Sequence, residues 1–244
     1  MIYQLSNSKL KIAVSDHGAE IVSVLHNGKE CVWQNENGLW NRHCPVLFPV
    51  CGRTSVNVDG KAYPIPFHGF ARDMVFKTVA ANKQDVSFVL QSNERTREMY
   101  PFDFELKITY TLDDCMVIVK NEVKNTGKEM MRFAIGRHDS FILDNDPGSY
   151  KLCFPKEERF LSQKYDNTSR RIDKYDNLGS GDVLIIPESI LSSSSSVTLQ
   201  NLNSDRVTLK TLDDRPIASI VWGEIKNLLL WHPRYSRYRL RSRL

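Results

Sequence analysis

The stretch Phe104-Glu105-Leu106-Lys107-Ile108-Thr109-Tyr110-Thr111-Leu112 decides the fold class of this chain. Five apolar residues alternate in it with four polar ones, so its apolar side chains all lie on one face of an extended backbone. This two-residue period is typical of a strand that buries one face in a core and exposes the other to water. We therefore predict a β-strand over residues 104–112.

The same period extends to both sides of this segment. Asp113-Asp114 predicts a turn, residues 115–123 predict the return strand, and residues 130–135 predict a further strand. The sequence Val58-Asp59-Gly60-Lys61 predicts a tight hairpin turn, because glycine readily adopts the positive φ that such a turn requires. The remaining predicted elements are strands over 10–14, 21–25 and 86–90, a short helix over 93–99, and a late hairpin formed by 197–199 and 206–211.

Together these patterns predict an all-β fold, a large antiparallel β-sandwich. The 244 residues suffice for one such sandwich, and no linker interrupts the pattern, so residues 1–233 are expected to form a single domain. With 41% hydrophobic and 25% charged residues, the composition excludes a disordered or fibrous chain. No apolar run approaches the roughly 18 residues of a membrane helix, and residues 1–7 do not resemble a secretory signal. We expect a cytoplasmic protein without a membrane partner.

The positive charge of the chain comes from its last residues. The formal net charge is +4, and five arginines without any acidic residue lie in 234–244. Without these arginines the net charge is −1, so the body of the protein is close to neutral and does not suggest a nucleic-acid partner. We expect the Arg-rich tail 234–244 to lie outside the native domain. One hypothesis is a frameshift in the coding DNA, and the alternative is a genuine basic tail that contacts nucleic acid or anionic lipid.

The five cysteines and six histidines lack the spacings of disulfide or metal frameworks. The cysteine count is odd and no pair has the C-x-x-C spacing, so free thiols in a reducing compartment are expected. The histidines form no zinc-binding pattern, and we therefore expect no metal. The oligomeric state is open between a monomer and a homodimer.

Two segments combine an apolar run, a glycine and a polar side chain suited to a ligand. In Phe48-Pro49-Val50-Cys51-Gly52-Arg53, the Arg53 guanidinium could hold hydroxyls or a carboxylate, and the alternative is a surface arginine at a strand end.

In Phe67-His68-Gly69-Phe70-Ala71-Arg72-Asp73, aromatic walls beside His68 suit a sugar, because C–H faces stack on rings while imidazole binds a hydroxyl. The alternative is a histidine satisfied in the core. Arg72-Asp73 is interpreted as a local charge pair or turn anchor.

A third segment, Gly136-Arg137-His138-Asp139-Ser140, places a histidine directly after a predicted strand. His138 could act there as a general acid or base. The neighbouring His138, Asp139 and Ser140 are not interpreted as a hydrolase triad, because triad residues meet in space and the chain has no G-x-S-x-G elbow.

These three segments, with Tyr100-Pro101-Phe102-Asp103-Phe104 and Val123-Lys124-Asn125-Thr126-Gly127, resemble the aldose 1-epimerase (galactose mutarotase) family and its bacterial LacX-like branch. The resemblance extends from about residue 10 to about residue 231, and the HGFARD segment, spaced after FPVCGR, is its most specific feature. It implies a large antiparallel β-sandwich and a cofactor-free reaction that interconverts the α and β anomers of a free aldose (hexose). In that reaction an acid protonates the ring oxygen while a base removes the proton of the C1 hydroxyl.

The resemblance also implies roles for individual residues. His138 takes the position of the catalytic acid. His68 and Arg53 match a substrate-holding histidine and arginine, and Asp182 matches a sugar-binding aspartate.

The chain departs from the family pattern in two places. Where the family has Gly-Gly-His-Pro-Ala-Phe, this chain has Gly-Arg-His-Asp-Ser-Phe at 136–141. An inward-pointing Arg137 is expected to lower the pKa of His138, crowd the pocket or attract a sugar phosphate. The family's base lies in a C-terminal Glu-Pro-Trp, whereas this chain reads Trp231-His232-Pro233 and has no glutamate after Glu224.

The expected function is therefore that of an aldose 1-epimerase-like protein that binds a hexose and lacks the family's C-terminal base. The missing glutamate favours one alternative, a non-catalytic carbohydrate-binding or sensing module. A second alternative is a hexose-6-phosphate 1-epimerase with Arg137 as a phosphate ligand, and a nucleic-acid binder that acts through the tail comes last.

Overall fold

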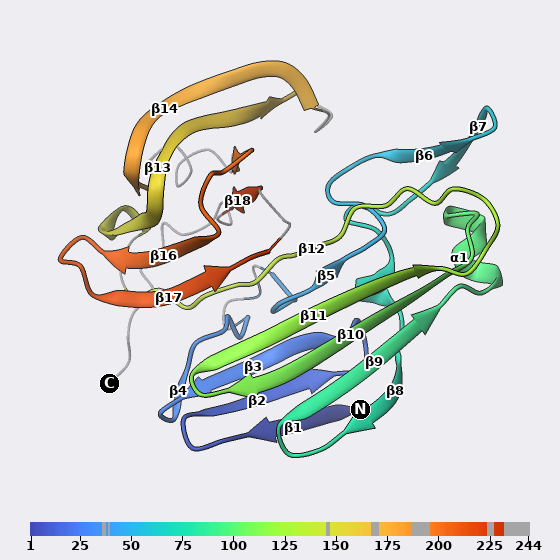
Figure 1. The fold of residues 1–244 in the computed structure, drawn as a ribbon, viewed down its shortest axis with the longest axis horizontal. Helices are drawn as coiled ribbons and strands as arrows, with labels where there is room; N and C mark the ends of the chain where they lie inside the picture. Colours follow the sequence, from blue (N-terminus) through green and yellow to red (C-terminus); the bar gives the residue numbers. More distant parts are fainter. Residues whose placement is uncertain are drawn as a thin grey trace. The chain divides into compact units, whose positions relative to one another are not determined.

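The computed structural model describes residues 1–35, 38, 40–144, 147–166, 171–186, 196–223 and 227–231. The chain divides into two compact units, Met1–Ile142 and Leu143–Leu244, which are described separately below (Figure 1). Strands in mostly antiparallel sheets dominate both units, so the prediction of an all-β antiparallel sandwich fold is confirmed. The tail 234–244 lies outside the described residues, and a single domain over 1–233 stays a prediction.

Two four-stranded antiparallel sheets form most of the first unit, and Figure 1 shows one in blue and the other in green. The first sheet has the order β1 (Ile2–Ser6), β2 (Leu10–Ser15), β3 (Glu20–His26), β4 (Lys29–Glu30). The second sheet has the order β11 (Met116–Asn125), β10 (Phe104–Asp113), β9 (Asp85–Gln91), β8 (Lys77–Ala81). One hydrophobic core contains buried side chains of both sheets, among them Ile12 of β2 and Ile108 of β10. The two sheets therefore share a core, as in a sandwich.

The strand β10 is the one predicted from residues 104–112. Burial alternates along it, with Leu106 and Ile108 fully buried and Lys107 and Thr109 partly exposed. It continues through the predicted turn into β11, where Asp113 pairs with Met116. The local pattern was sufficient here because neighbours in sequence are also partners in the sheet.

Shorter elements connect the two sheets of the first unit. The ribbon β5 (Val46–Leu47) with β12 (Gly136–Arg137) is antiparallel, and β6 (Ser55–Val58) with β7 (Lys61–Pro64) forms the predicted hairpin. Its turn has φ of +49° at Asp59 and +78° at Gly60. The predicted helix is α1 (Glu94–Met99), capped by Asn93, whose side chain accepts the Thr96 N–H at 3.0 Å.

The prediction of a strand over residues 130–135 is wrong. These residues form no regular pairing, and the backbone of Ala134 donates one hydrogen bond to the carbonyl of Pro49 at 2.8 Å. Proline has no N–H to return such a bond, so a continuous ladder cannot form beside it. Regular pairing starts only at Gly136, in β12.

The second unit contains one six-stranded sheet. Its strands are β13 (Tyr150–Tyr165), β14 (Arg171–Ile185), β15 (Val197–Leu199), β16 (Arg206–Thr211), β17 (Pro216–Val221) and β18 (Leu228–Leu230), and a short 3₁₀ turn, η2 (Pro147–Ser149), precedes them. The order is β17-β16-β13-β15-β18, with β14 also paired to β13. A second hydrophobic core, which includes Phe154, Phe160 and Leu199, belongs to this unit.

The prediction that residues 197–199 and 206–211 form a hairpin is wrong, although both are strands. The strands β15 and β16 do not pair with each other, because β13 lies between them. With 16 residues, β13 is long enough to pair Tyr150 with Thr211 of β16 and Ser162 with Leu199 of β15.

Two other expectations concern the state of the cysteines and membrane-spanning helices. All five cysteines are free thiols, as predicted. Within the part of the chain that the structure describes, no helix combines the length and hydropathy needed to cross a bilayer.

Candidate functional site

The first two motif segments of the sequence lie side by side in the first unit. Phe48 and Gly69 form a parallel bridge. The Phe48 carbonyl accepts the N–H groups of Phe70 at 3.0 Å and Ala71 at 3.2 Å. This bonding brings the segment that ends at Arg53 next to the segment that contains His68.

The imidazole of His68 is fixed by the glycine that precedes Arg53. The Gly52 N–H donates to Nδ1 of His68 at 2.9 Å, and the His68 N–H donates to the Gly52 carbonyl at 2.9 Å. His68 has a φ of +66°, a left-handed conformation that is uncommon for residues other than glycine. Because Nδ1 accepts a hydrogen bond, the neutral ring carries its proton on Nε2. His68 can therefore donate a hydrogen bond to a ligand oxygen from Nε2.

His138 lies directly after β12, where the chain is paired with β5. Its N–H donates to the Pro45 carbonyl at 3.1 Å. The His138 ring lies edge-on to the His68 ring, with 6.1 Å between the ring centroids, and Trp40 packs on it at 4.7 Å. The structure thus brings together two histidines that are 70 positions apart in the printed sequence.

Arg53 is exposed and lies beside Phe67, the residue that precedes His68. Its guanidinium carbon is 5.6 Å from the centroid of the Phe67 ring, a cation–π contact. The Phe67 ring in turn lies 3.9 Å from the His68 ring and keeps 44% of its surface exposed. Arg53, Phe67, His68 and His138 therefore form a partly open site with aromatic surface and hydrogen-bond donors.

Burial favours the neutral form of both imidazoles. Burial lowers the pKa of His68 to about 4, with further contributions from the charges of Arg72 and His138. Burial also lowers the pKa of His138, and Arg72 acts in the same direction, whereas Asp139 and a backbone hydrogen bond oppose the shift. Neutral imidazoles can both donate and accept hydrogen bonds with hydroxyl groups of a ligand.

These lowered pKa values predict a loss of stability in mild acid. An unfolded histidine has a pKa of about 6.5, so between that pH and about 4 the unfolded chain binds protons that folded His68 does not. The free energy of unfolding should therefore fall as the pH drops through this window, and be fully regained above it. Urea unfolding at pH 7, 6 and 5 measures this, and a His68→Gln variant should show a smaller decline. An identical decline in both proteins would contradict the assignment.

Arg72 has the local structural role that the sequence indicated. One of its terminal nitrogens donates to the Phe67 carbonyl, and its Nε lies 3.8 Å from a carboxylate oxygen of Asp73. Asp73 is bonded more closely by Arg42, at 2.5 Å. Arg72 thereby anchors the turn η1 (Ala71–Asp73), which follows His68 in the chain.

Arg137 points into the first unit, and only 14% of its side chain is exposed. Its guanidinium is bonded to Asp139, to the Tyr110 hydroxyl and to the Cys44 carbonyl. The charges that shift the pKa of His138 are those of Asp139 and Arg72, not that of Arg137. Arg137 therefore does not account for the lowered pKa of His138. A role of Arg137 as a phosphate ligand stays a prediction.

Asp182 lies in the second unit, on β14, and is exposed. It falls at an irregular part of the β13–β14 ladder, between the pairs of Gly181 and Val183. A hollow of about 400 Å³ in this unit is lined by neighbouring residues such as Ser180, but not by Asp182. The assignment of Asp182 to a sugar site stays a prediction.

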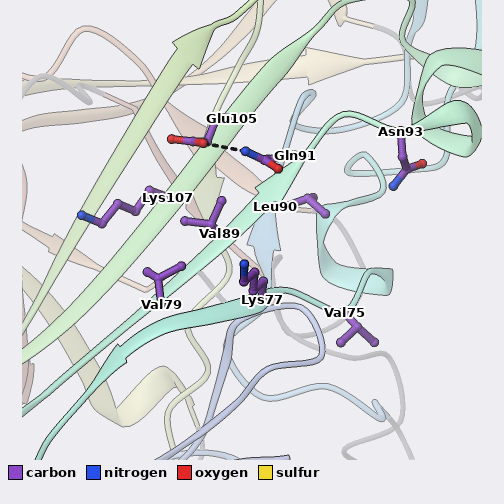
Figure 2. A pocket seen from close by; sticks show the side chains of 9 residues that line it. All are labelled: Val75, Lys77, Val79, Val89, Leu90, Gln91, Asn93, Glu105 and Lys107. Atoms are coloured by element: carbon purple, nitrogen blue, oxygen red, sulfur yellow. Dashed lines mark hydrogen bonds between the residues drawn. The ribbon is translucent and has the colours of Figure 1, made fainter.

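Figure 2 shows a larger hollow, of about 470 Å³, on the outer face of the β8–β9–β10 sheet of the first unit. Val89 of β9 and Lys107 of β10 line it, and Gln91 donates to Glu105 at 2.9 Å across it. None of the predicted site residues borders this hollow. Its size alone does not make it a site, because its lining mixes valines and mutually bonded polar groups.

Two residues of the site region were not predicted from the sequence. Trp40 packs on His138, and Tyr110 reaches Arg137 from β10. A signal for Tyr110 was present, since a tyrosine on an otherwise apolar buried face needs a partner for its hydroxyl. Among the described residues, no group of three His, Cys, Asp or Glu side chains could hold a metal ion.

The fold places the chain in the class of galactose mutarotase-like β-proteins. The sequence profile of the family Aldose 1-epimerase matches residues 1–238, and the chain belongs to this family. The plasmid and chromosomal LacX proteins of Lactococcus lactis subsp. lactis are each 28% identical to it over 250 residues, covering 95% of this chain and 83% of theirs.

Two solved structures show the same likeness. A galactose mutarotase-like protein from Lactobacillus casei ATCC 334 superposes with a TM-score of 0.88 at 26% identity, covering 96% of this chain and 84% of that one. A galactose mutarotase related enzyme from Lactobacillus acidophilus gives a TM-score of 0.75 at 28% identity, covering 87% and 74%.

Proposed function

We propose that this protein binds a free hexose and interconverts its α and β anomers by acid–base opening of the sugar ring. The observation that carries the proposal is the pair of imidazoles, His68 and His138, 6.1 Å apart beside an exposed aromatic ring and Arg53. Membership of the aldose 1-epimerase family supports the same substrate class.

In this proposal His138 is the general acid. Protonated His138 gives its proton to the ring oxygen as the bond between C1 and that oxygen breaks, and the C1 hydroxyl loses its proton to a base or to water as it becomes the aldehyde. The open aldehyde then rotates before the ring closes again. The burial that lowers the pKa of His138 makes its protonated form a stronger acid than free imidazolium. Contact with Trp40 on one side keeps the ring in a fixed orientation.

His68 and Arg53 hold the substrate in this proposal. The Nε2–H of neutral His68 donates to a sugar hydroxyl, because its Nδ1 is occupied by the Gly52 N–H. Arg53 offers further donors from an exposed position, and the face of Phe67 offers a surface for C–H groups. Asp182 is assigned as a third hydroxyl ligand from the resemblance alone.

The base is the missing part of this scheme. The family resemblance implies a C-terminal glutamate, but the chain reads Trp231-His232-Pro233 where Glu-Pro-Trp is expected. Residues 224–226 and 232–244 lie outside the described residues. The absence of Glu-Pro-Trp favours a second candidate, a carbohydrate-binding module that keeps the pocket without turnover.

The proposed reaction uses neither a cofactor nor a metal. We place it in the cytoplasm, in a monomer or homodimer whose partner is the small sugar and not nucleic acid or a membrane.

Polarimetry on freshly dissolved α-glucose and α-galactose tests the proposal. The chain as printed and a variant given a Glu-Pro-Trp ending are compared with spontaneous anomer exchange. We expect the rate constant to rise in proportion to protein concentration, and the restored ending to add a factor of about 10²–10⁴. If neither protein accelerates exchange while calorimetry still detects sugar binding, the binding module replaces the enzyme.

A further inference from the structure

The two residues that flank His138 are bonded to each other. Nε of Arg137 lies 3.1 Å from Oδ1 of Asp139, and a terminal nitrogen lies 2.9 Å from the same oxygen. In an extended segment, alternate side chains point to the same side, so Arg137 and Asp139 share one side of the chain. His138 lies on the other side, against Trp40 and His68.

The Arg137 guanidinium is anchored to the core of the first unit through Tyr110. A terminal nitrogen donates to the Tyr110 hydroxyl at 2.9 Å, and that hydroxyl donates to the Ala19 carbonyl at 2.5 Å. Tyr110 lies on β10 and is fully buried, and Ala19 lies directly before β3 of the other sheet. Arg137 is therefore tied to both sheets of the sandwich.

The backbone around His138 is fixed on both sides by the segment that precedes β5. The His138 N–H donates to the Pro45 carbonyl at 3.1 Å, and the Ser140 hydroxyl donates to the His43 carbonyl at 2.5 Å. That segment is held in turn by the buried carboxylate of Glu20, which accepts the N–H groups of His43 and Cys44. The backbone carbonyls of Pro45 and His43, which accept hydrogen bonds from the 137–140 segment, are therefore held in fixed positions.

The charges of the cluster depend on one another. Burial by itself would lower the pKa of Arg137, but Asp139, Tyr110 and Cys44 outweigh it and raise the pKa well above its usual value. The side chains of Arg137 and Asp139 keep only 14% and 27% of their surface exposed. Removing one partner leaves a largely buried charge without compensation, whereas removing both does not.

The cluster coincides with the departures from the family pattern. Arg137, Asp139 and Ser140 stand where the family has glycine, proline and alanine, and each of them makes a bond described above.

We propose that Arg137, Asp139 and Tyr110 form a clamp that positions the imidazole of His138, with Arg137 as a positioning residue rather than a ligand of the sugar. This inference rests on the proposed function for its consequence in catalysis. The clamp concerns the orientation and surroundings of the His138 imidazole, so it can be tested even in a protein that does not turn over a substrate.

The kinetic arm of the test uses Arg137→Met, the double variant Arg137→Met/Asp139→Asn and Tyr110→Phe. A shift of the acid by about 1 Å can cost about 10²-fold in rate. We expect Arg137→Met to lower kcat for anomer exchange by about that factor, while KM changes less than about twofold, because Arg53 and His68 hold the sugar. The double variant should be no slower than Arg137→Met, since the clamp acts as a unit. Tyr110→Phe removes only the hydroxyl and should give a smaller loss in the same direction.

The matched control is Arg97→Met. Arg97, on α1, also donates to an aspartate, Asp103, at 2.7 Å, but both side chains are exposed. This variant should keep the parent kcat and KM.

The second arm follows the His138 imidazole by NMR during a pH titration, with its signal assigned from its loss in His138→Gln. The charged groups that act on this ring are Asp139, which raises its pKa, and Arg72, which lowers it. Asp139→Asn should therefore lower the pKa of His138, and Arg137→Met should broaden or shift its signal. If the parent protein does not exchange anomers, the proposed function fails but this arm still decides on the clamp. An unchanged His138 signal and titration in both variants, or an unchanged kcat in Arg137→Met, would overturn it.

Discussion

Replacing Gly69 with alanine is expected to lower the free energy of unfolding by more than about 4 kcal/mol, the largest stability effect that we predict for a single methyl group. A Cβ at this position would lie 2.1 Å from the Phe48 carbonyl oxygen and 2.8 Å from the Pro49 nitrogen. The carbonyl cannot move aside, because it accepts the N–H groups of Phe70 and Ala71. Since Gly69 follows His68, the variant should also lose the arrangement of the site.

Gly60→Ala is the matched control for this substitution. Gly60 has a φ of +78°, almost the same as the +76° of Gly69, but no atom lies within 4 Å of its added Cβ. The control should therefore cost only the left-handed backbone, about 1–2 kcal/mol. Urea unfolding followed by circular dichroism measures both. Equal losses in the two variants would show that the close approach of Gly69 to Phe48 has no energetic consequence.

Replacing His138 with glutamine should lower the rate of anomer exchange by about 10²–10⁴-fold, or roughly 3–5 kcal/mol of transition-state stabilisation. Glutamine has a similar reach and can form hydrogen bonds, but it cannot deliver a proton to the ring oxygen. Sugar binding should change little, because His68 and Arg53 are untouched. Exchange is measured by polarimetry in whichever of the printed and restored chains is more active, and binding by calorimetry.

Two further variants serve as comparisons for His138→Gln. His68→Gln removes the proposed donor to a hydroxyl and should mainly raise KM. His26→Gln changes an exposed histidine of β3 whose ring contacts only the neighbouring Asn27 among the partners described, so its kinetics should match the parent. A His138→Gln protein that exchanges anomers at the parent rate would remove His138 from the acid role.

The parts of the fold that could be predicted are those specified by local chemistry. The alternation over residues 104–112 determines β10, the Asp59-Gly60 turn determines the β6–β7 hairpin, and Asn93 caps α1. The two wrong expectations concern pairing between distant segments. Residues 130–135 have a strand-like pattern but lie beside a proline, and the strands 197–199 and 206–211 are separated by β13.

The same distinction applies to the candidate site. Residues His68 and His138 were found from their motifs, and the structure brings their rings together. The orientation of Arg137 was not predictable, because it depends on Asp139 and on Tyr110. Tyr110 is 27 positions away in sequence and lies on the buried apolar face of β10. A motif indicates which residues are present at a site, whereas the direction of a side chain depends on partners that the motif does not contain.

The pairing of β5 with β12 has a consequence for the protein as it is being made. Val46–Leu47 can pair with Gly136–Arg137 only after the latter have been synthesised. The roughly 90 residues between the two strands take about 5–20 s to synthesise at ordinary rates of translation. Until then Val46 and Phe48, which are fully buried in the finished protein, have no partner strand on this side. The nascent chain therefore presents an apolar, unpaired segment for several seconds, which is the kind of surface that ribosome-associated chaperones cover.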